Sequence, residues 1–173
     1  MLLLVCLIIS PSLCFSVPLS EEDPQHIQKI KTTQHVLYET YLETDKGIAS
    51  VFGYHFDMYF WEKTAFVLAI FGAVGGERGG YGIAAMGLNY EHALTEKLNW
   101  DTRALTGSGG GGGLDAGGGF MVEVQTGPVY HVTPFFSIEA KYGYLKFPTG
   151  SFESPIYNIG FSIHRNHLFL PVY

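Results

Sequence analysis

The stretch GIASVFGYHFDMYF, residues 47–60, decides the fold that we expect for this chain. Large apolar side chains alternate along it with small or polar ones, as when successive residues point to opposite faces of a β-strand. One face carries Ile48, Ser50, Phe52, Tyr54, Phe56, Met58 and Phe60, and the other carries Ala49, Val51, Gly53, His55, Asp57 and Tyr59. Because ordinary globular strands have roughly 5 or 6 residues, so long an alternation predicts an unusually long strand.

The same period of two continues through the chain and predicts eight strands of about 10 to 13 residues. They centre on residues 35–44, 47–60, 64–74, 84–91, 98–105, 120–125, 136–144 and 157–163. Strands that cross a bilayer need about 9 to 11 residues, so the strand length favours a membrane protein. For the first segment a helix is the alternative, because four apolar residues also fit one helical face: Ile27, Ile30, Leu37 and Tyr41.

Short and long connections alternate between the expected strands after the first hairpin. The tight connections are 61–63, 92–95 and 132–134, and the longer ones are 75–80, 107–119 and 148–155. Outer-membrane barrels have this pattern, with short periplasmic turns and longer external loops. The even number of strands then places both chain termini on the periplasmic side.

Aromatic residues gather at the three tight connections, which all belong to one rim of the expected barrel. They are Tyr59, Phe60, Trp61, Tyr90, Trp100, Tyr130, Phe135 and Phe136. Membrane barrels carry girdles of aromatic side chains at the bilayer interface. The placement therefore predicts an aromatic girdle at this rim.

The composition narrows the class of protein further. Only 15% of the 173 residues are charged, against roughly 25% in soluble domains. The net charge of −6 excludes the basic field of a nucleic-acid-binding protein. The longest apolar run after the N-terminal segment, residues 64–74, is about half the length of a membrane-spanning helix. A soluble eight-stranded barrel is the alternative, but its outer face would need more charge, so we predict an all-β, eight-stranded antiparallel up-and-down transmembrane β-barrel.

The N-terminal residues MLLLVCLIISPSLCFS read as a signal peptide covering 1–16. Both cysteines, Cys6 and Cys14, fall within it, so the mature chain would contain no disulfide. We expect a polar periplasmic lead at 17–34, the barrel at 35–165 and a C-terminal tail at 166–173.

A few charged residues stand on the polar faces of three successive strands and predict an ion network in the lumen. They are Asp101, Arg103, Glu123, Glu139 and Lys141. Charges in a lumen with little water must be paired. A simple hairpin register would place Arg103 near Glu123, and Glu123 within a diagonal step of Lys141. We expect these residues to plug the barrel and to play a structural role.

The glycine-rich stretch GSGGGGGLDAGGG, residues 107–119, contains a G-x-G-x-x-G pattern. A dinucleotide site would need a helix after it, whereas FMVEVQTG alternates as a strand. We therefore interpret 107–119 as a flexible external loop after a strand that ends near Leu105. His164 and His167 would face opposite sides of a strand, so we expect no metal site and no cofactor.

At this point the chain resembles the small eight-stranded outer-membrane barrels of Gram-negative bacteria, the OmpA-like, OmpX-like and OmpW-like class. The signal segment, the alternating strands over 35–165 and the closing stretch YNIGFSI, residues 157–163, carry the resemblance. It implies a bacterial outer-membrane location, contact with outer-membrane lipid and lipopolysaccharide, and insertion by the barrel-assembly machinery. We also expect a monomer. The residues past the closing stretch depart from the pattern, because such chains usually stop at its final aromatic residue.

We therefore expect a non-enzymatic barrel, structural or surface-exposed, with a lumen plugged by side chains. One alternative is a barrel that binds or transports a small or hydrophobic ligand. The other is a lipid A-modifying enzyme, for which His131 and Thr133 are the nearest polar pair, although they lie at the periplasmic rim.

Overall fold

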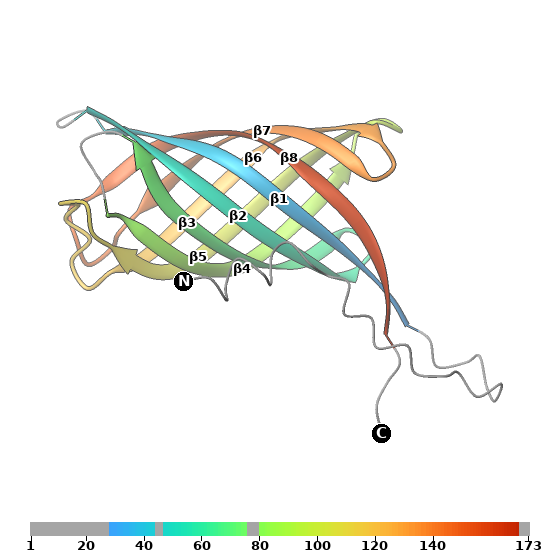
Figure 1. The fold of residues 1–173 in the computed structure, drawn as a ribbon, viewed down its shortest axis with the longest axis horizontal. Helices are drawn as coiled ribbons and strands as arrows, with labels where there is room; N and C mark the ends of the chain where they lie inside the picture. The colour runs from blue at the N-terminus through green and yellow to red at the C-terminus, as the bar shows by residue number, and fades with distance from the viewer. Residues whose placement is uncertain (1–27, 44–46, 76–79, 170–173) are drawn as a thin grey trace, which may run out of the picture.

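The structure is a computed structural model, and it describes residues 28–43, 47–75 and 80–169. These residues form eight strands that close into one barrel, drawn with its long axis horizontal in Figure 1. The strands are β1 (Gln28–Glu43), β2 (Gly47–Trp61), β3 (Thr64–Gly75), β4 (Gly82–Ala93), β5 (Leu98–Gly110), β6 (Phe120–Thr133), β7 (Phe136–Lys146) and β8 (Glu153–Phe169). The expected signal peptide and its two cysteines lie outside the described residues.

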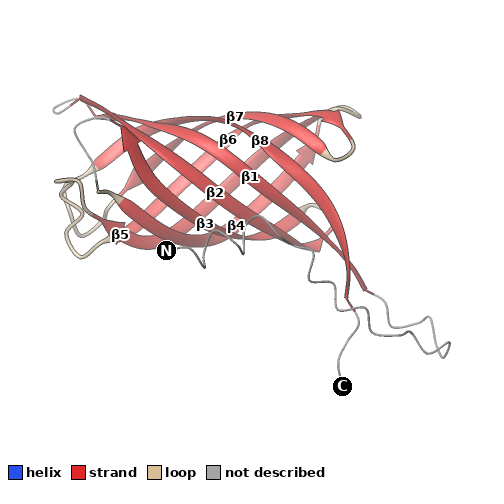
Figure 2. Ribbon diagram, in the orientation of Figure 1, coloured by secondary structure: helices blue, strands red, loops and turns tan. Residues whose placement is uncertain are grey.

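Each strand pairs in antiparallel fashion with its neighbours in sequence, and β1 closes the barrel against β8. Figure 2 shows that strands make up almost the whole of the described chain. This confirms the predicted all-β, eight-stranded, up-and-down topology, including the strand reading of the first segment. Among the described residues, no helix has the length and apolar character needed to span a membrane.

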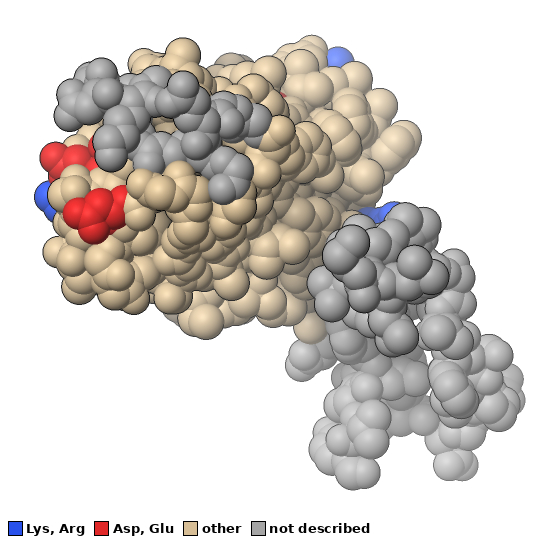
Figure 3. All heavy atoms as spheres, turned by 60° about the vertical axis from the view of Figure 1, so that its left-hand side comes forward, with Lys and Arg blue, Asp and Glu red and all other residues tan. Residues whose placement is uncertain are grey.

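The two faces predicted for residues 47–60 are the two faces of β2. Ile48 is 60% exposed on the outside, whereas Val51 and His55 are fully buried in the lumen. β3 follows the same rule, with Leu68 outside and Val67 inside. Figure 3 shows the resulting outer wall, which is drawn almost wholly in uncharged residues, with acidic residues gathered at one end.

The structure corrects two expected boundaries of the barrel, the one with the lead (17–34) and the one with the tail (166–173). β1 already begins at Gln28, and β8 continues to Phe169. The two segments pair with each other, from Gln28 opposite Phe169 to Thr33 opposite His164, and extend past the rim in Figure 1. Backbone hydrogen bonds hold these two segments together. Beyond the rim neither face of the strand pair needs to be apolar, so the sequence shows no alternating pattern there.

The rim at the tight turns carries the expected girdle, with one exception. Exposed aromatic side chains surround it, namely Phe60, Trp61, Tyr90, Trp100, Tyr130 and Phe135, and Phe136 is partly exposed. Tyr59, however, turns into the lumen, is 8% exposed and hydrogen bonds to Glu91. Its position next to Phe60 in the alternation explains the difference, because neighbouring residues of a strand face opposite sides.

The glycine-rich stretch is divided between a strand and a loop, which corrects the expected end of this strand near Leu105. β5 runs on to Gly110, with Gly107 opposite Ala85 on β4. The strands approach so closely here that a Cβ on Gly107 would lie 2.4 Å from the carbonyl oxygen of Ala84. The connection is therefore 111–119, and the first glycines serve strand pairing.

The 111–119 loop has defined partners in the connection between β7 and β8. The Gly118 amide donates to the Thr149 hydroxyl at 3.0 Å, and the Ser151 hydroxyl donates to Asp115 at 2.7 Å. Gly117 has a φ of +54°, and a Cβ there would lie 2.0 Å from the Thr149 carbonyl oxygen. The loop that we expected to be flexible is thus packed against the neighbouring connection.

The lumen as candidate functional site

Apolar side chains are buried in the half of the lumen near the longer connections, and we call this cluster the apolar plug. Its main members are Tyr41, Val51, Phe71, Tyr81, Ile83, Leu105, Met121, Leu145, Phe147, Phe152 and Ile156. Tyr41 and Tyr81 meet edge to face with 5.8 Å between ring centroids, and Phe147 lies 6.1 Å from Phe152. Ala116 from the 111–119 loop joins the same cluster, so the external loop covers the plug.

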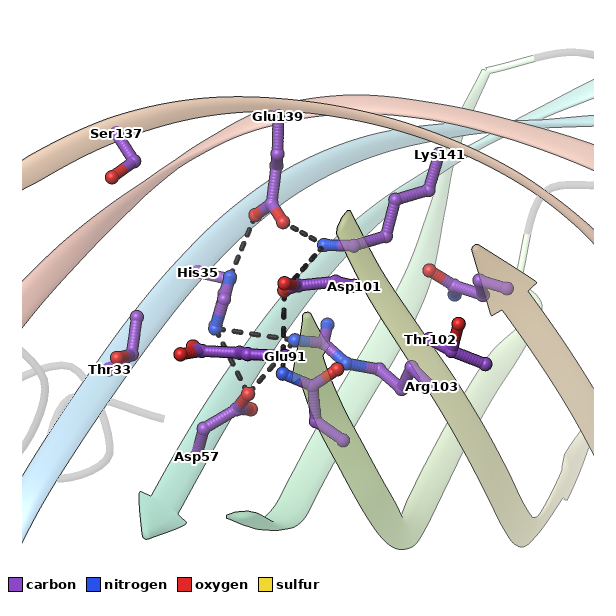
Figure 4. Close-up of polar contacts among 12 residues, drawn as sticks. Thr33, His35, Asp57, Glu91, Asp101, Thr102, Arg103, Ser137, Glu139 and Lys141 are labelled. Carbon is purple, nitrogen blue, oxygen red and sulfur yellow. Dashed lines mark hydrogen bonds and ion pairs between the residues drawn. The ribbon is translucent and has the colours of Figure 1, made fainter. Parts of the chain in front are cut away.

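Below the plug, the middle of the lumen holds an ion network made by His35, Asp57, Asp101, Arg103, Glu139 and Lys141 (Figure 4). Arg103 is fully buried, and its Nη2 lies 3.0 Å from Asp57 Oδ2. The guanidinium also contacts the rings of His55 and His35. A buried guanidinium is tolerable only with such partners, because removing a charge from water is costly.

His35 and Lys141 connect the acidic residues of the network. His35 lies between two carboxylates, with Nε2 at 3.2 Å from Asp57 Oδ2 and Nδ1 at 2.7 Å from Glu139 Oε1. Lys141 ion-pairs with Glu139 and lies 3.8 Å from Asp101. The network therefore links β1, β2, β5 and β7 across the barrel, as the dashed lines of Figure 4 show.

All five residues that the sequence singled out, Asp101, Arg103, Glu123, Glu139 and Lys141, are buried in the lumen. Arg103 interacts electrostatically with Glu123, near which we expected it, but its ion pair is with Asp57. The β5–β6 register places Gln125 opposite Arg103 and Leu105 opposite Glu123. Arg103 instead reaches Asp57, and Lys141 reaches Glu139 and Asp101 in place of Glu123.

Sequence reasoning missed His35, His55 and Asp57 as members of the network. His55 and Asp57 do stand on the inner face of residues 47–60, so their inward direction was available from the alternation. Their partner was not, because Arg103 is 46 residues from Asp57 and meets it across the lumen, not along a hairpin.

A second polar cluster, the carboxylate pair, separates the ion network from the apolar plug. Glu39 and Glu123 are both fully buried. The Gln125 side-chain amide donates to Glu39 at 3.2 Å and to Glu123. The Asn158 amide donates to Gln125 Oε1 at 2.7 Å and to Glu39 at 3.4 Å.

The mouth of the lumen at the tight turns contains a cluster of hydroxyl and imidazole groups. Ser137 Oγ lies 2.7 Å from both His131 Nδ1 and His164 Nε2, and Thr33 Oγ1 lies 3.0 Å from His164 Nδ1. The partner of His131 is thus Ser137, not the Thr133 considered from sequence. His164 is oriented by a hydroxyl where a serine-hydrolase triad would place a carboxylate, and Ser137 is fully buried.

The mouth also has one charged pair. Lys31 Nζ lies 3.0 Å from Glu91 Oε2 and 3.8 Å from the centre of the Tyr59 ring. Among the described residues, no three His, Cys, Asp or Glu side chains are arranged to hold a metal ion together. Buried side chains thus occur at the level of the plug, of the ion network and of the mouth.

Comparisons with known proteins give matches only at the level of structure. No protein-family model matches the chain, and no curated protein matches it. A de novo designed transmembrane β-barrel aligns over 77% of this chain and 95% of its own, with a TM-score of 0.56 and 12% identity. The outer-membrane protein Ail of Yersinia pestis, studied in a phospholipid bilayer nanodisc, aligns over 78% of this chain and 99% of its own, with a TM-score of 0.54 and 12% identity.

The crystal structure of Ail, the attachment invasion locus protein of Yersinia pestis, aligns over 79% of this chain and 98% of its own, with a TM-score of 0.52 and 12% identity. Identity this low shows likeness of fold alone. The chain therefore has the fold of the small eight-stranded transmembrane β-barrels, and the bacterial outer-membrane protein Ail has the same fold.

Proposed function

We propose that this chain is a non-enzymatic barrel of the bacterial outer membrane. It exposes its external rim at the cell surface and passes no solutes. The observation that carries the proposal is the combination of an almost uncharged outer wall with large buried side chains at successive levels of the lumen. On this proposal, the apolar plug closes one half of the lumen and the ion network closes its middle.

The outer wall supports a membrane location. Leu68, Ile70 and Met86 are each about half exposed in the middle of their strands. A contiguous apolar surface of this kind is unfavourable in water and is satisfied by lipid. The exposed aromatic girdle then marks one interface of the bilayer. Outer-membrane lipid and lipopolysaccharide are the contacts that we propose for this wall, with a single barrel as the unit.

The large side chains buried inside the barrel support a structural or surface role over transport. Barrels of eight strands have an interior just wide enough for side chains. With the lumen closed, the parts available to partners outside the cell are the external connections, above all 111–119 and 147–152. One structural neighbour is named an attachment invasion locus protein, so this fold is compatible with a role at the cell surface.

The proposal is tested by the location and orientation of two single cysteine variants. Gly118→Cys places a thiol on the exposed external loop, and Glu62→Cys places one on a tight turn at the opposite rim. In intact Gram-negative cells that express the full chain, a membrane-impermeant maleimide is expected to label Gly118→Cys alone. Both variants are expected in the outer-membrane fraction with heat-modifiable gel mobility. The parent chain is the control, because it shows any labelling of the native cysteines.

Recovery of the folded chain in a soluble fraction would contradict the membrane assignment. Labelling of Glu62→Cys in place of Gly118→Cys would contradict the orientation. Lipid A mass spectra are expected to be identical with and without the protein, and a new lipid A species would favour the enzyme alternative.

A further inference from the structure

A groove crosses the outer wall of the barrel over β2 to β5. It has a volume of about 670 Å³, and large apolar side chains form its sides, namely Tyr54, Phe56, Leu68, Ile70 and Met86. Leu68, Ile70 and Met86 are each about half exposed, because they point away from the lumen. The groove therefore lies on the face that a transmembrane barrel turns towards lipid.

The floor of the groove is formed by small side chains. The strand register aligns Ile70 on β3 with Ala84 on β4 and Ser108 on β5, in one row across the wall. In the next row towards the longer connections, Gly72 pairs with Gly82. A Cβ on Gly72 would meet no atom beyond its chain neighbours within 4 Å, so the space outside this row is open. The surface of the wall therefore drops beside Ile70, from a large side chain to small ones and to bare backbone.

The Ser108 hydroxyl marks the end of the groove that lies nearer the longer connections. Thr106 Oγ1 donates to the Met121 carbonyl oxygen at 3.2 Å, whereas no residue in the described chain hydrogen bonds to the exposed Ser108 hydroxyl. A hydroxyl without a partner costs free energy where water is absent. In a lipid leaflet, ester carbonyls lie at the boundary of the hydrocarbon core, where each acyl chain joins its headgroup. Ser108 can therefore donate to the ester of a chain that lies in the groove.

The shape of the groove fits a hydrocarbon chain better than a second barrel. A flexible acyl chain can lie between side chains of unequal height, and it restores the dispersion contacts that an unfilled groove denies to its lining. A second copy would present the convex wall of a barrel, and a stable protein interface needs about 800 Å² from each partner. The few side chains around this groove provide much less.

We propose that the groove binds one acyl chain of the lipid A part of lipopolysaccharide, and that Ser108 donates a hydrogen bond to the ester of that chain. The inference rests on the proposed outer-membrane location and orientation. In that orientation the longer connections face the cell exterior, and the end of the groove at Ser108 lies in the outer leaflet, where lipopolysaccharide is the lipid. The groove thus names one lipid and one place on the wall for the lipid contact proposed above.

The test is to express the full chain in Gram-negative cells whose lipopolysaccharide carries only a minimal sugar, and to extract it from the outer membrane in mild detergent. Native mass spectrometry then identifies the lipid that stays bound after loosely held lipid has been washed away. We expect a single lipopolysaccharide molecule on the parent barrel. The affinity is measured by titrating lipid A into the barrel refolded in detergent micelles.

The matched variants are Ala84→Leu in the groove and Ala140→Leu on β7, away from it, and both alanines are exposed on the outer wall. Ala84→Leu fills the floor and is expected to weaken lipid A binding about tenfold, whereas Ala140→Leu is expected to bind as the parent does. Ser108→Ala removes the hydroxyl and is expected to weaken binding about threefold. Heat-modifiable gel mobility verifies that each variant is folded.

Three results would overturn the inference while leaving the proposed function intact. The first is a parent barrel that leaves the outer membrane without bound lipid. The second is retention of phospholipid in place of lipopolysaccharide. The third is equal binding by Ala84→Leu and Ala140→Leu, which would show that lipid surrounds the wall without a defined site. Absence of the chain from the outer membrane would instead overturn the proposed function, and this inference with it.

Discussion

At the scale of single residues, Arg103 is the side chain on which the lumen most depends. It is fully buried, ion-paired to Asp57 and in contact with two histidines. The value of such a pair lies mainly in the cost of breaking it, because the remaining charge cannot return to water. Removal of either partner should therefore be far more harmful than removal of both.

We predict that Arg103→Met lowers the free energy of unfolding by about 3–5 kcal/mol, because it leaves Asp57 buried without its cation. Arg103→Met combined with Asp57→Asn is expected to recover much of that loss. Guanidinium titration of the barrel in lipid vesicles, followed by tryptophan fluorescence, measures both. Lys146→Met is the control, since its ion pair with Glu153 is exposed at the external rim and should matter little. A free energy of unfolding for Arg103→Met equal to that of the parent would contradict this role.

At the scale of elements, the strands and the connections follow different rules. The alternation over 47–60 was sufficient to predict both faces of β2, because a strand buried on one face must repeat every two residues. The start of β1 at Gln28 and the end of β8 at Phe169 were not predictable in this way, since pairing of the two segments replaces an apolar face. The structure of the 111–119 loop depends on contacts with Thr149 and Ser151, which no local pattern reveals.

The wall of the barrel gives a prediction that compares two leucines of similar exposure. Leu68 lies in the middle of β3, whereas Leu94 lies at a tight turn, and they are 44% and 49% exposed. In a bilayer, Leu68→Arg is expected to lower the free energy of unfolding by about 2–4 kcal/mol and Leu94→Arg by about 0–1 kcal/mol. The measurement is equilibrium unfolding from lipid vesicles. Equal costs for the two arginines would argue that lipid does not surround the middle of the wall.

The external loop gives a second prediction at this scale, from two adjacent glycines. Gly117→Ala is expected to destabilise by about 1–3 kcal/mol, because it combines a positive φ with a clash against the Thr149 carbonyl oxygen. Gly118→Ala meets its nearest atom, Thr149 Oγ1, at 3.4 Å and should be tolerated. Limited proteolysis of the inserted barrel reports the loop directly, with faster cleavage near 111–119 in Gly117→Ala alone. Identical cleavage of both variants would show that the packing of this loop is not held by Gly117.

At the scale of the whole molecule, the sequence predicts the barrel better than it predicts the contacts inside it. Inward direction follows from alternation, so the burial of Arg103, Glu139 and Lys141 was accessible. The choice of partner depends on the barrel's width and on the relative height of opposite strands, which is why the ion pair of Arg103 with Asp57 on β2 was not predictable. A difference of two residues in strand register decides which side chains meet across the lumen. Counting residues along a single hairpin does not give the register between opposite strands.

The whole structure gives one account, in which lipid surrounds an uncharged wall and side chains close the lumen. Conductance in a planar lipid bilayer tests this account most directly. The protein is delivered from lipid vesicles, in which heat-modifiable gel mobility first verifies that the barrel is folded. A lumen filled by the apolar plug and the ion network predicts a bilayer that stays at its baseline current, without discrete steps, in molar KCl. Regular, ion-selective conductance steps from the inserted parent barrel would contradict the closed lumen and favour a transport function.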